Sequence, residues 1–475
     1  MENPSTRHQT NSIAQEMSNL ILEKPFFFAK NSYAQAKKIS VLKSITDLNQ
    51  SIYIPGSKSI ANRALILAGM STNSTTLHKF LFAQDTYYGL LALQTLGFHI
   101  NCNFEKEMVV ISPSENRMGD YIFLGKAGTL ARFFPAVILN WQNTFPRAPA
   151  LTVTLDGEEQ LKKRPLGEYL TALKTLDGII DANSLPTKIS SSSLGGVCEI
   201  SGRTSGQFLS GLLLAACGAK NKITIHRKEN LVQPNYIEIT IKMIQEFGGK
   251  IIANKELTKF EVYPIEKLGR DNYIIEADAS TACYFICLAF LHNFNLSILN
   301  LGKNTLQPDY KLTYILQEIG ASIFIEETKT HVLKKEKLTQ IKFSTKINCS
   351  DFSDQALTLG VLALFSNKPV EFYGIGHIRH HESDRISCFV KNLTNLGCEA
   401  YEKQDGFVVK PIEKNCREIS GVWETFNDHR FAMSGFLLAS LCPNVKINNP
   451  VVVEKTAPQF FELVKTLGFD IIAEE

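Results

Sequence analysis

Long apolar runs, paired cysteines and a strong charge of either sign are absent from this 475-residue chain. No apolar run reaches the roughly eighteen residues that a membrane-spanning helix needs. The first residues, M-E-N-P-S-T-R-H-Q-T, lack the apolar region of a signal peptide. A formal net charge of +3 argues against a nucleic-acid-binding protein with a dominant basic face. The ten cysteines occur singly, with no C-x-x-C pair, which argues against a disulfide framework. We therefore expect a cytoplasmic protein with reduced thiols that binds neither nucleic acid nor membranes.

Several familiar ligand-binding motifs are also absent. G-I-G at Gly374 lacks the remaining glycine of a dinucleotide fingerprint, and no G-x-x-x-x-G-K-[ST] or G-x-S-x-G motif occurs. His377, His381 and His429 are candidate metal ligands, but their spacing is not that of a zinc site. The sequence therefore favours neither a nucleotide cofactor nor a metal.

What the chain does contain is a segment that recurs six times, at intervals of roughly seventy to eighty residues. Each copy begins with polar residues and continues as a run rich in Ala, Leu and Phe, which predicts a helix buried on nearly every side. The first copy starts at Ile54 and carries Lys58, Ser59 and Arg63 in its turn and first helical turn. The other copies start at Gly125, Thr204, Asp278, Ser353 and Asn427.

Amphipathic segments alternate with these buried ones, and most of them end at a glycine that suits the left-handed position after a helix. These glycines are Gly97, Gly248, Gly320, Gly397 and Gly468. Short β-branched runs such as K-I-T-I-H from Lys222 and V-V-V-E from Val451 predict strands. The repeated unit is therefore strand–helix–strand–helix–strand, and a chain of this length predicts two or more domains.

Cationic side chains gather at the starts of the repeats or in the loops that face them. Free N–H groups and the helix dipole favour negative charge at a helix N-terminus, and arginine is the usual partner of planar carboxylates and phosphates. In a roughly neutral protein this pattern indicates a cleft that binds small anions. The seven residues are Lys58, Arg63, Arg132, Arg164, Arg385, Arg430 and Lys455.

Two acidic residues lie in the same cationic surroundings. Glu382 stands between His381 and Arg385 in H-I-R-H-H-E-S-D-R, and Asp354 opens the preceding buried helix. A carboxylate beside cations is either part of a structural ion pair or an acid–base group with a shifted pKa. The spacing leaves both interpretations open.

Taken together, these motifs resemble those of the 5-enolpyruvylshikimate-3-phosphate synthase (3-phosphoshikimate 1-carboxyvinyltransferase) family. In chain order they are P-G-S-K-S-x-x-N-R-A-L-x-L-A, L-G-x-A-G-T, K-x-R-P, D-A-S-x-A-x-Y-F, H-E-S-D-R, N-D-H-R-x-A-M and K-T-x-P-x-F-F. The likeness runs from about Ile39 to the C-terminus. It leaves residues 1–38 as an N-terminal extension, for which an extra helix, a flexible arm and a wrongly assigned start are all open.

The resemblance implies an α/β fold of two inside-out, barrel-like domains, each made of three βαβαββ modules around an approximate threefold axis. One domain would comprise residues 57–276 and the other residues 39–56 and 277–475, with the active site in the cleft between them. The family transfers the enolpyruvyl group of phosphoenolpyruvate to the 5-hydroxyl of shikimate 3-phosphate and releases phosphate, without a metal or organic cofactor. We expect a monomer whose partners are these two anionic substrates.

Family roles, carried onto the matching positions, imply the following site. Asp354 would hydrogen-bond the attacking hydroxyl and Glu382 would deliver a proton to the methylene carbon, with Lys58 and His381 as further catalytic residues. Shikimate 3-phosphate would be bound by Lys58, Ser59, Arg63, Ser205, Gly206, Gln207, Gln233, Asp354, His377 and His381. Phosphoenolpyruvate would be bound by Lys58, Lys126, Gly128, Arg164, Gln207, Arg385, Arg430 and Lys455.

Several positions depart from the family pattern. His381 stands where lysine is common, and because histidine titrates near neutrality we expect a steeper pH dependence of the rate below pH 7. Lys126 replaces a common asparagine near the phosphate of phosphoenolpyruvate. Gly206 and Gln233 replace two serines of the acceptor's phosphate pocket, and Arg203 is a candidate substitute partner for that phosphate.

Two other functions stay open on this evidence. A paralogous enolpyruvyl transferase with a different hydroxylated acceptor would explain Gly206 and Gln233. A catalytically silent binding protein on the same scaffold is disfavoured, because such a protein has no need to keep Lys58, Asp354 and Glu382 together with Arg430.

Overall fold

The computed structural model describes residues 33, 36–43, 48–114, 117–336 and 341–474. In this part of the chain the strands pair into six four-stranded sheets. In every sheet one parallel pair of strands is followed by two antiparallel pairs. This shared order confirms that one structural unit is repeated six times.

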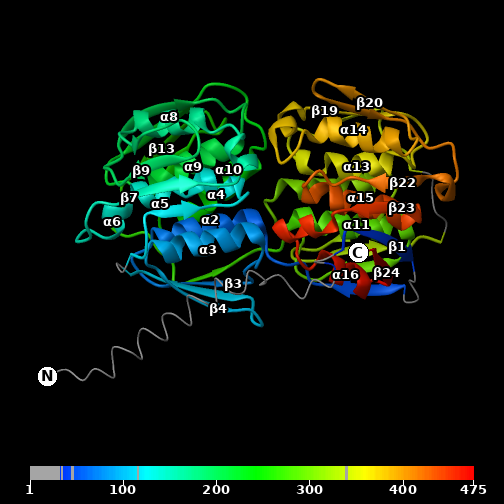
Figure 1. Ribbon diagram of the computed structural model, residues 1–475, viewed down its shortest axis with the longest axis horizontal. Coiled ribbons are helices and arrows are strands. Elements are labelled where there is room, and N and C mark those ends of the chain that lie inside the picture. Colours follow the sequence, from blue (N-terminus) through cyan, green and yellow to red (C-terminus); the bar gives the residue numbers. More distant parts are fainter. Residues whose placement is uncertain (1–32, 34–35, 44–47, 115–116, 337–340, 475) are drawn as a thin grey trace.

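Two lobes lie side by side, with three sheets in each (Figure 1). In the first lobe, the first sheet has the strand order β14 (Asn272–Ile274), β3 (Thr75–His78), β5 (Met108–Ser112) and β4 (His99–Asn103). The second sheet has the order β6 (Tyr121–Phe123), β7 (Thr152–Asp156), β9 (Thr187–Ser190) and β8 (Ile179–Ile180). The third sheet has the order β10 (Gly196–Ile200), β11 (Ile223–Arg227), β13 (Lys259–Tyr263) and β12 (Lys250–Ala253). In the second lobe, one sheet has the strand order β22 (Ser420–Trp423), β23 (Asn444–Asn448), β1 (Lys38–Lys43) and β24 (Phe469–Glu474). Another has the order β16 (Ser322–Ile325), β17 (Thr330–Leu333), β15 (Asn295–Ile298) and β2 (Asn49–Ile52). The remaining sheet has the order β18 (Lys346–Asn348), β19 (Val370–Tyr373), β21 (Gly406–Val409) and β20 (Ala400–Lys403).

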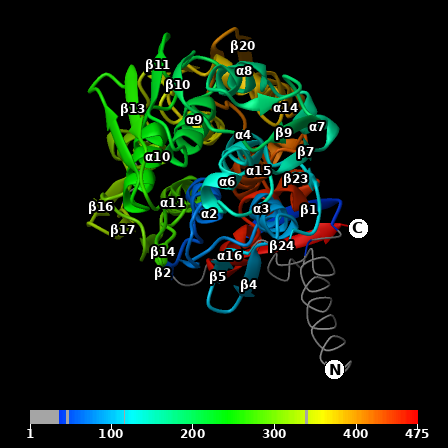
Figure 2. The ribbon, with the colours of Figure 1, turned by 90° about the vertical axis from the view of Figure 1, so that its left-hand side faces the viewer.

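The six polar-then-apolar segments form helices that are buried along most of their length, as expected. They are α2 (Lys58–Gly69), α4 (Gly128–Phe133) with α5 (Pro135–Leu139), α9 (Gly206–Cys217), α11 (Ala279–His292), α13 (Ala356–Ala363) and α15 (His429–Leu441). Figure 2 shows the sheets of the first lobe around α2, α4 and α9, so the helices lie inside and the sheets outside. The segment from Gly125 is divided into two helices because Pro135 has no N–H to continue the hydrogen-bond ladder.

The amphipathic segments form a second set of helices. They are α3 (Gln84–Thr95), α8 (Gly167–Thr175), α10 (Asn235–Glu246), α12 (Lys311–Glu318), α14 (Arg385–Asn395) and α16 (Phe460–Thr466), and two short helices are α6 (Trp141–Thr144) and α7 (Glu159–Lys162). All five glycines expected after helices have positive φ, between 74° at Gly397 and 112° at Gly320. The local signal for these helix ends is therefore confirmed.

One strand prediction is wrong. The run V-V-V-E from Val451 lies in a 3₁₀ segment, η5 (Pro450–Lys455), and not in a strand. Strand β23 ends at Asn448 because Asn449 adopts a left-handed conformation (φ 48°) and Pro450 cannot donate to a ladder. The turn directs Lys455 toward the interior, where its side chain is buried.

Each lobe has its own hydrophobic core. The described residues of the first core lie between Ile60 and Ile275, and those of the second lie between Ala277 and Phe469, together with Tyr33, Ala36, Ile39, Val41, Ile52 and Ile54. The chain passes between the lobes at Gly56 and at Ala277, and these two residues form an antiparallel bridge. The two connections are therefore joined to each other, directly beside the start of α2.

No helix among the described residues is long and apolar enough to cross a bilayer. The expectations of a helix or an arm before residue 33 fall outside the described part of the chain. Tyr33 and Ala36 are described, and both are buried in the core of the second lobe.

Candidate active site

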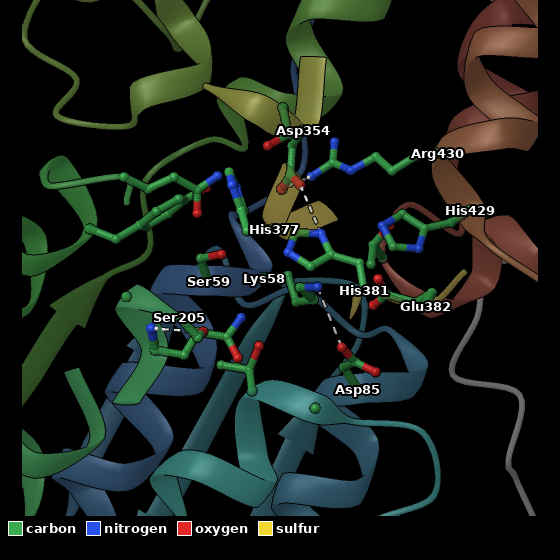
Figure 3. Close-up of a pocket in the computed structure, with 18 of the residues that line it drawn as sticks. Lys58, Ser59, Asp85, Ser205, Asp354, His377, His381, Glu382, His429 and Arg430 are labelled. Atoms are coloured by element: carbon green, nitrogen blue, oxygen red, sulfur yellow. Dashed lines mark hydrogen bonds and ion pairs between the residues drawn. The ribbon is translucent and has the colours of Figure 1, made fainter. Parts of the chain in front are cut away.

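A pocket lies between the two lobes and is lined by residues of both. All but two of the residues that the sequence assigns to catalysis or substrates line it. These residues are Lys58, Ser59, Arg63, Gly128, Arg164, Ser205, Gly206, Gln207, Gln233, Asp354, His377, His381, Glu382, Arg385 and Arg430. Residues that are hundreds of positions apart in the chain thus face one space (Figure 3).

Helix N-termini converge on this pocket from both lobes. The first N–H groups of a helix have no intrahelical acceptor and lie at the positive end of its dipole, so the arrangement favours anionic ligands. The helices that begin at a pocket-lining residue are α2 at Lys58, α4 at Gly128, α9 at Gly206, α14 at Arg385 and α15 at His429.

The two expected residues outside the lining differ in position. Lys126 is one-third exposed and its Nζ lies 3.5 Å from Glu158 Oε2. Lys455 is buried, and its Nζ donates to Glu382 Oε1 at 2.7 Å. Lys455 therefore pairs with Glu382, which lines the pocket, whereas Lys126 pairs with Glu158, which does not.

Asp354 is held between two arginines. Arg385 donates to Asp354 Oδ1 at 2.8 Å and Arg430 donates to Oδ2 at 2.9 Å. His381 Nδ1 lies 3.9 Å from Oδ1. Burial by itself would raise the pKa of Asp354, but Arg430 and then Arg385 outweigh it and hold the pKa well below its usual range. Asp354 is thus a fully ionised carboxylate in this structure.

Glu382 has a similar environment on the same wall. Its Oε1 accepts from Lys455 at 2.7 Å and lies 3.6 Å from Arg164, and its Oε2 accepts from Arg385 at 3.1 Å. Burial would raise the pKa of Glu382, but Lys455 and then Arg164 and Arg385 lower it well below the usual value. Arg164 belongs to the first lobe, so one of these charges reaches across the pocket.

The three pocket histidines are held neutral. Burial, followed by the charge of Arg385, lowers the pKa of His381 well below 6.5, although Asp354 partly opposes this. Burial likewise lowers the pKa of His377 and that of His429. The expectation that His381 titrates near neutrality is therefore wrong for this structure. Among the described residues no group of three or more His, Cys, Asp or Glu side chains has an arrangement that could hold a metal ion.

Arg63 uses its guanidinium within the protein. Its Nε donates to Thr240 Oγ1 at 2.8 Å, and its other nitrogens donate to the Ser59 carbonyl at 2.8 Å, to Ser210 Oγ at 3.2 Å and to the Tyr236 carbonyl at 3.3 Å. Burial lowers the pKa of Arg63 to about 10, so the side chain stays charged at neutral pH. Arg63 therefore joins α2, α9 and α10 at the pocket wall and keeps its positive charge there.

Gly128 allows two arginines to approach the backbone. A Cβ at this position would lie 2.1 Å from Arg164 Nη1 and 2.8 Å from Arg132 Nη1. Arg132 does not line the pocket, and it donates to the carbonyls of Gly128 at 2.7 Å and Pro165 at 3.0 Å. Arg132 thus supports the loops that carry Gly128 and Arg164.

The two replaced serines are linked by geometry. A Cβ at Gly206 would lie 2.9 Å from the carbonyl oxygen of Val232, closer than real Cβ contacts. The next residue, Gln233, has φ 52°, a left-handed conformation that is uncommon for glutamine. The loop at residues 232–233 therefore lies against the start of α9, and this close approach is compatible with glycine at position 206.

Gln233 also connects the two lobes. Its Nε2 donates to Ser353 Oγ at 3.0 Å, and Ser353 Oγ lies 2.8 Å from His377 Nε2. Ser353 Oγ therefore links Gln233 of the first lobe to His377 of the second. A second bridge runs from Gln160 Nε2 to the carbonyl of Glu382 at 2.5 Å.

Two acidic residues of the pocket were missed by the sequence analysis. Asp85, in the first turn of α3, is buried and its Oδ2 lies 3.4 Å from Lys58 Nζ. Asp278 caps α11 by accepting from the Thr281 N–H at 2.9 Å, and it also accepts from the Lys58 N–H at 3.3 Å. The signal available for Asp278 was a charged residue at the start of an otherwise buried helix. The signal for Asp85 was weaker, because it consisted only of a position at the start of a helix.

Several buried polar atoms of the pocket have no hydrogen-bond partner among the described residues. Such atoms are uncommon in folded proteins and mark places where a ligand or water completes the bonding. They are Asp85 Oδ1, Arg164 Nε, Gln207 Oε1, His429 Nδ1 and Arg430 Nε.

The fold and this pocket define a class of two-lobed α/β proteins that bind small anions between the lobes, with two carboxylates set among the cations. Comparison with known proteins names the family. The family model of EPSP synthase, 3-phosphoshikimate 1-carboxyvinyltransferase, matches residues 42–464. The chain therefore belongs to the EPSP synthase family, and the resemblance seen in its motifs is confirmed.

Individual relatives agree over almost the whole chain. A protein of Buchnera aphidicola subsp. Baizongia pistaciae named 3-phosphoshikimate 1-carboxyvinyltransferase is 34% identical over 437 residues, which are 90% of this chain and 98% of that protein. "3-phosphoshikimate 1-carboxyvinyltransferase 2" of Halalkalibacterium halodurans is 32% identical over 436 residues, 89% of this chain and 93% of that protein. The solved structure of EPSP synthase from Acinetobacter baumannii has the same fold, with a TM-score of 0.74, 21% identity, and coverage of 92% of this chain and 99% of that chain.

Proposed function

We propose that this protein transfers the enolpyruvyl group of phosphoenolpyruvate to the 5-hydroxyl of shikimate 3-phosphate and releases phosphate. The observation that supports this proposal is that Asp354 and Glu382 face one pocket. Each carboxylate is paired with cations that can bind an anionic substrate instead. Membership of the EPSP synthase family supports the same reaction.

The phosphoenolpyruvate site comprises the cations around these two acids. Its phosphate and carboxylate replace Asp354 and Glu382 as partners of the arginines and lysines, which suit such groups. The proposed contacts are Lys58, Gly128, Arg164, Gln207, Arg385, Arg430 and Lys455, with Lys126 at the edge.

The acceptor site lies mainly on the first lobe. Ser59 and the buried charge of Arg63 attract the carboxylate of shikimate 3-phosphate, and Ser205 and Gln207 contact its hydroxyls and phosphate. Gln233, His377 and His381 complete the site from the loop at residues 232–233 and from the second lobe. The proposed acceptor contacts are Lys58, Ser59, Arg63, Ser205, Gly206, Gln207, Gln233, Asp354, His377 and His381.

The pKa values of the two acids change when the donor binds. In this structure the cations keep Asp354 and Glu382 ionised. When phosphoenolpyruvate engages those cations, less positive charge remains for the carboxylates, and both pKa values rise. Glu382 can then deliver a proton to the methylene carbon while Asp354 hydrogen-bonds the attacking hydroxyl; such groups contribute roughly 10²–10⁴ each to the rate.

Phosphate release measured with pure protein, phosphoenolpyruvate and shikimate 3-phosphate tests the proposal, with Glu382→Ala as the inactive control. Release by the wild type alone supports it. If phosphate is released neither with this acceptor nor with any other hydroxylated acid, the enzyme assignment is refuted.

A second candidate acceptor is favoured by one observation. Gly206 and Gln233 replace two hydroxyl donors on the acceptor side, and the loop at residues 232–233 fills space beside α9. A paralogous transferase with a different hydroxylated acceptor would release phosphate only with that acceptor, so the same assay distinguishes the two.

We also propose a cytoplasmic monomer. A single chain supplies every contact named above, and all ten cysteines are free thiols, as is typical of a reducing compartment. We propose that residues 57–276 act as one domain and residues 39–56 with 277–475 as the other.

A further inference from the structure

Asp309 is a buried acid that the proposed reaction does not use. It lies in the 3₁₀ segment η1 (Pro308–Tyr310) of the second lobe, and its side chain is fully buried. Asp309 does not line the pocket, but two residues close to its carboxylate, Ser280 and Arg430, do. A buried charge is costly unless its neighbours compensate it, so the neighbours of Asp309 indicate what the charge does.

Two neutral donors and one cation meet at a single oxygen of Asp309. Oδ2 accepts from the Ser280 hydroxyl and from Gln355 Nε2, the latter at 3.0 Å, and it lies 3.9 Å from Arg430 Nη2. Hydrogen-bond donors and a cation favour the charged form of a carboxylate. Burial, followed by the charge of Asp354, raises the pKa of Asp309 to about 6, and Arg430 opposes this rise. The carboxylate of Asp309 is therefore ionised at pH 7.5.

Arg430 is shared between two carboxylates. Its Nη2 donates to Oδ2 of the pocket residue Asp354 at 2.9 Å (Figure 3), and the same nitrogen lies 3.9 Å from Asp309 Oδ2. Gln355, which follows Asp354 in η2 (Ser353–Gln355), ties the two acids together by donating to Asp309. Two like charges beside one guanidinium repel each other, so each carboxylate makes the other bind a proton more readily.

We propose that Asp309 is a positioning residue for the transferase reaction, and that it acts through Arg430 on Asp354. The charge of Asp309 takes up part of the attraction of Arg430, which limits how firmly Arg430 holds Asp354 as an ionised carboxylate. The inference rests on the proposed function, in which Asp354 hydrogen-bonds the attacking hydroxyl. Repulsion from Asp309 strengthens that hydrogen bond, because a carboxylate that binds a proton more readily is a better acceptor.

The same geometry implies little effect on the binding of phosphoenolpyruvate. Either Asp354 or an anionic group of phosphoenolpyruvate pairs with Arg430, and the charge of Asp309 repels both to a similar extent. Exchange of one anion for the other therefore leaves the repulsion almost unchanged. Asp309 thus affects the rate of the bound complex more than the affinity for the donor.

The test compares Asp309→Asn with the wild type in the phosphate-release assay at pH 7.5. The amide has nearly the same shape as the acid, and its oxygen can still accept from Ser280 and Gln355, but it carries no charge. We expect kcat to fall about tenfold while the KM for phosphoenolpyruvate stays within about twofold. Asp351→Asn is the matched control, because it neutralises an exposed acid that pairs with Lys311, and both constants should stay within about twofold.

Two results would overturn the proposal. An unchanged kcat in Asp309→Asn would show that the charge has no effect on the reaction. A rise in KM that equals or exceeds the fall in kcat would show that Asp309 merely holds Arg430 in place for binding. Poor folding does not hide either result, because Asp309→Ser is a second uncharged variant. In addition, a single-turnover rate constant does not depend on the folded fraction as long as folded enzyme exceeds phosphoenolpyruvate.

The wild type separates this inference from the proposed function. If the wild type releases phosphate and Asp309→Asn releases it with the same kcat, only the role of Asp309 is refuted. If the wild type releases no phosphate with any hydroxylated acceptor, the proposed function is refuted and the inference is refuted with it.

Discussion

The two walls of the pocket differ in kind. We call the pocket-lining residues of the first lobe the first wall and those of the second lobe the second wall. On the second wall Asp354 and Glu382 form an ion-pair network with Arg385, which also bonds Asp428. The first wall offers hydroxyls, amides and glycine backbone, such as those of Ser205, Gln207 and Gly206, together with three cations, Lys58, Arg63 and Arg164.

This contrast separates chemistry from recognition. Opposite charges on the second wall hold each other's pKa values far from their ordinary range, so a bound anion that disturbs one pair changes the proton affinity of the next. On the first wall the acids are fewer, and neutral donors stand beside the cations. Most departures from the family pattern, Gly206, Gln233 and Lys126, fall in the first lobe.

Removing the acid of the second wall should have the largest effect. Glu382→Gln keeps the shape but cannot deliver a proton, so kcat should fall about 10²–10⁴-fold in the phosphate-release assay. Glu402→Gln changes an exposed acid that pairs with Arg379 and should leave kcat within about twofold. Equal rates for Glu382→Gln and the wild type would remove Glu382 from catalysis.

The substitution Gly128→Ala tests whether the position of Arg164 on the first wall is needed to bind phosphoenolpyruvate. The new Cβ would displace the Arg164 guanidinium, a flexible group, so the fold should survive while a charge-assisted contact is lost. The KM for phosphoenolpyruvate should rise about 10–100-fold. Gly119→Ala is the matched control, because its Cβ would approach Thr95 only to 3.4 Å. An unchanged KM in Gly128→Ala would contradict the assigned position of Arg164.

The bridge from Gln233 should have a smaller effect, confined to the acceptor. Gln233→Ala removes a neutral hydrogen bond between the walls, and the KM for shikimate 3-phosphate should rise about fivefold with little change in kcat. Gln233→Gly removes the same amide but relieves the positive φ. If the amide is what matters, the glycine variant will bind the acceptor as weakly as the alanine variant; wild-type binding by both variants would contradict a role for the amide.

The smallest effect concerns pH. Because burial and Arg385 lower the pKa of His381 well below 6.5, its protonated form appears only at pH values well below 6.5. The ratio of kcat/KM in the wild type to that in His381→Gln should therefore stay constant within about twofold from pH 6 to pH 8. An acid limb near pH 6.5 that is present in the wild type and missing in the variant would show that His381 does titrate there.

Local patterns predicted much of the fold. The apolar runs from Ile54 and Asp278 gave buried helices, and Gly97 and Gly468 marked helix ends, because periodicity and backbone preference act within a few residues. The same reasoning failed at Val451, whose β-branched run is typical of a strand. There the left-handed Asn449 and the proline after it decided the conformation.

The sequence by itself determined which side chains would be available: cations and acids at the starts of repeated helices, recognisable in motifs such as H-E-S-D-R. Only the tertiary structure decided their pairing. It set Arg385 against Asp354 and Glu382, placed the unforeseen Asp85 beside Lys58, and made His381 neutral. Charge, burial and pKa depend on distances between residues far apart in the chain, and folding of the two lobes around one pocket sets those distances.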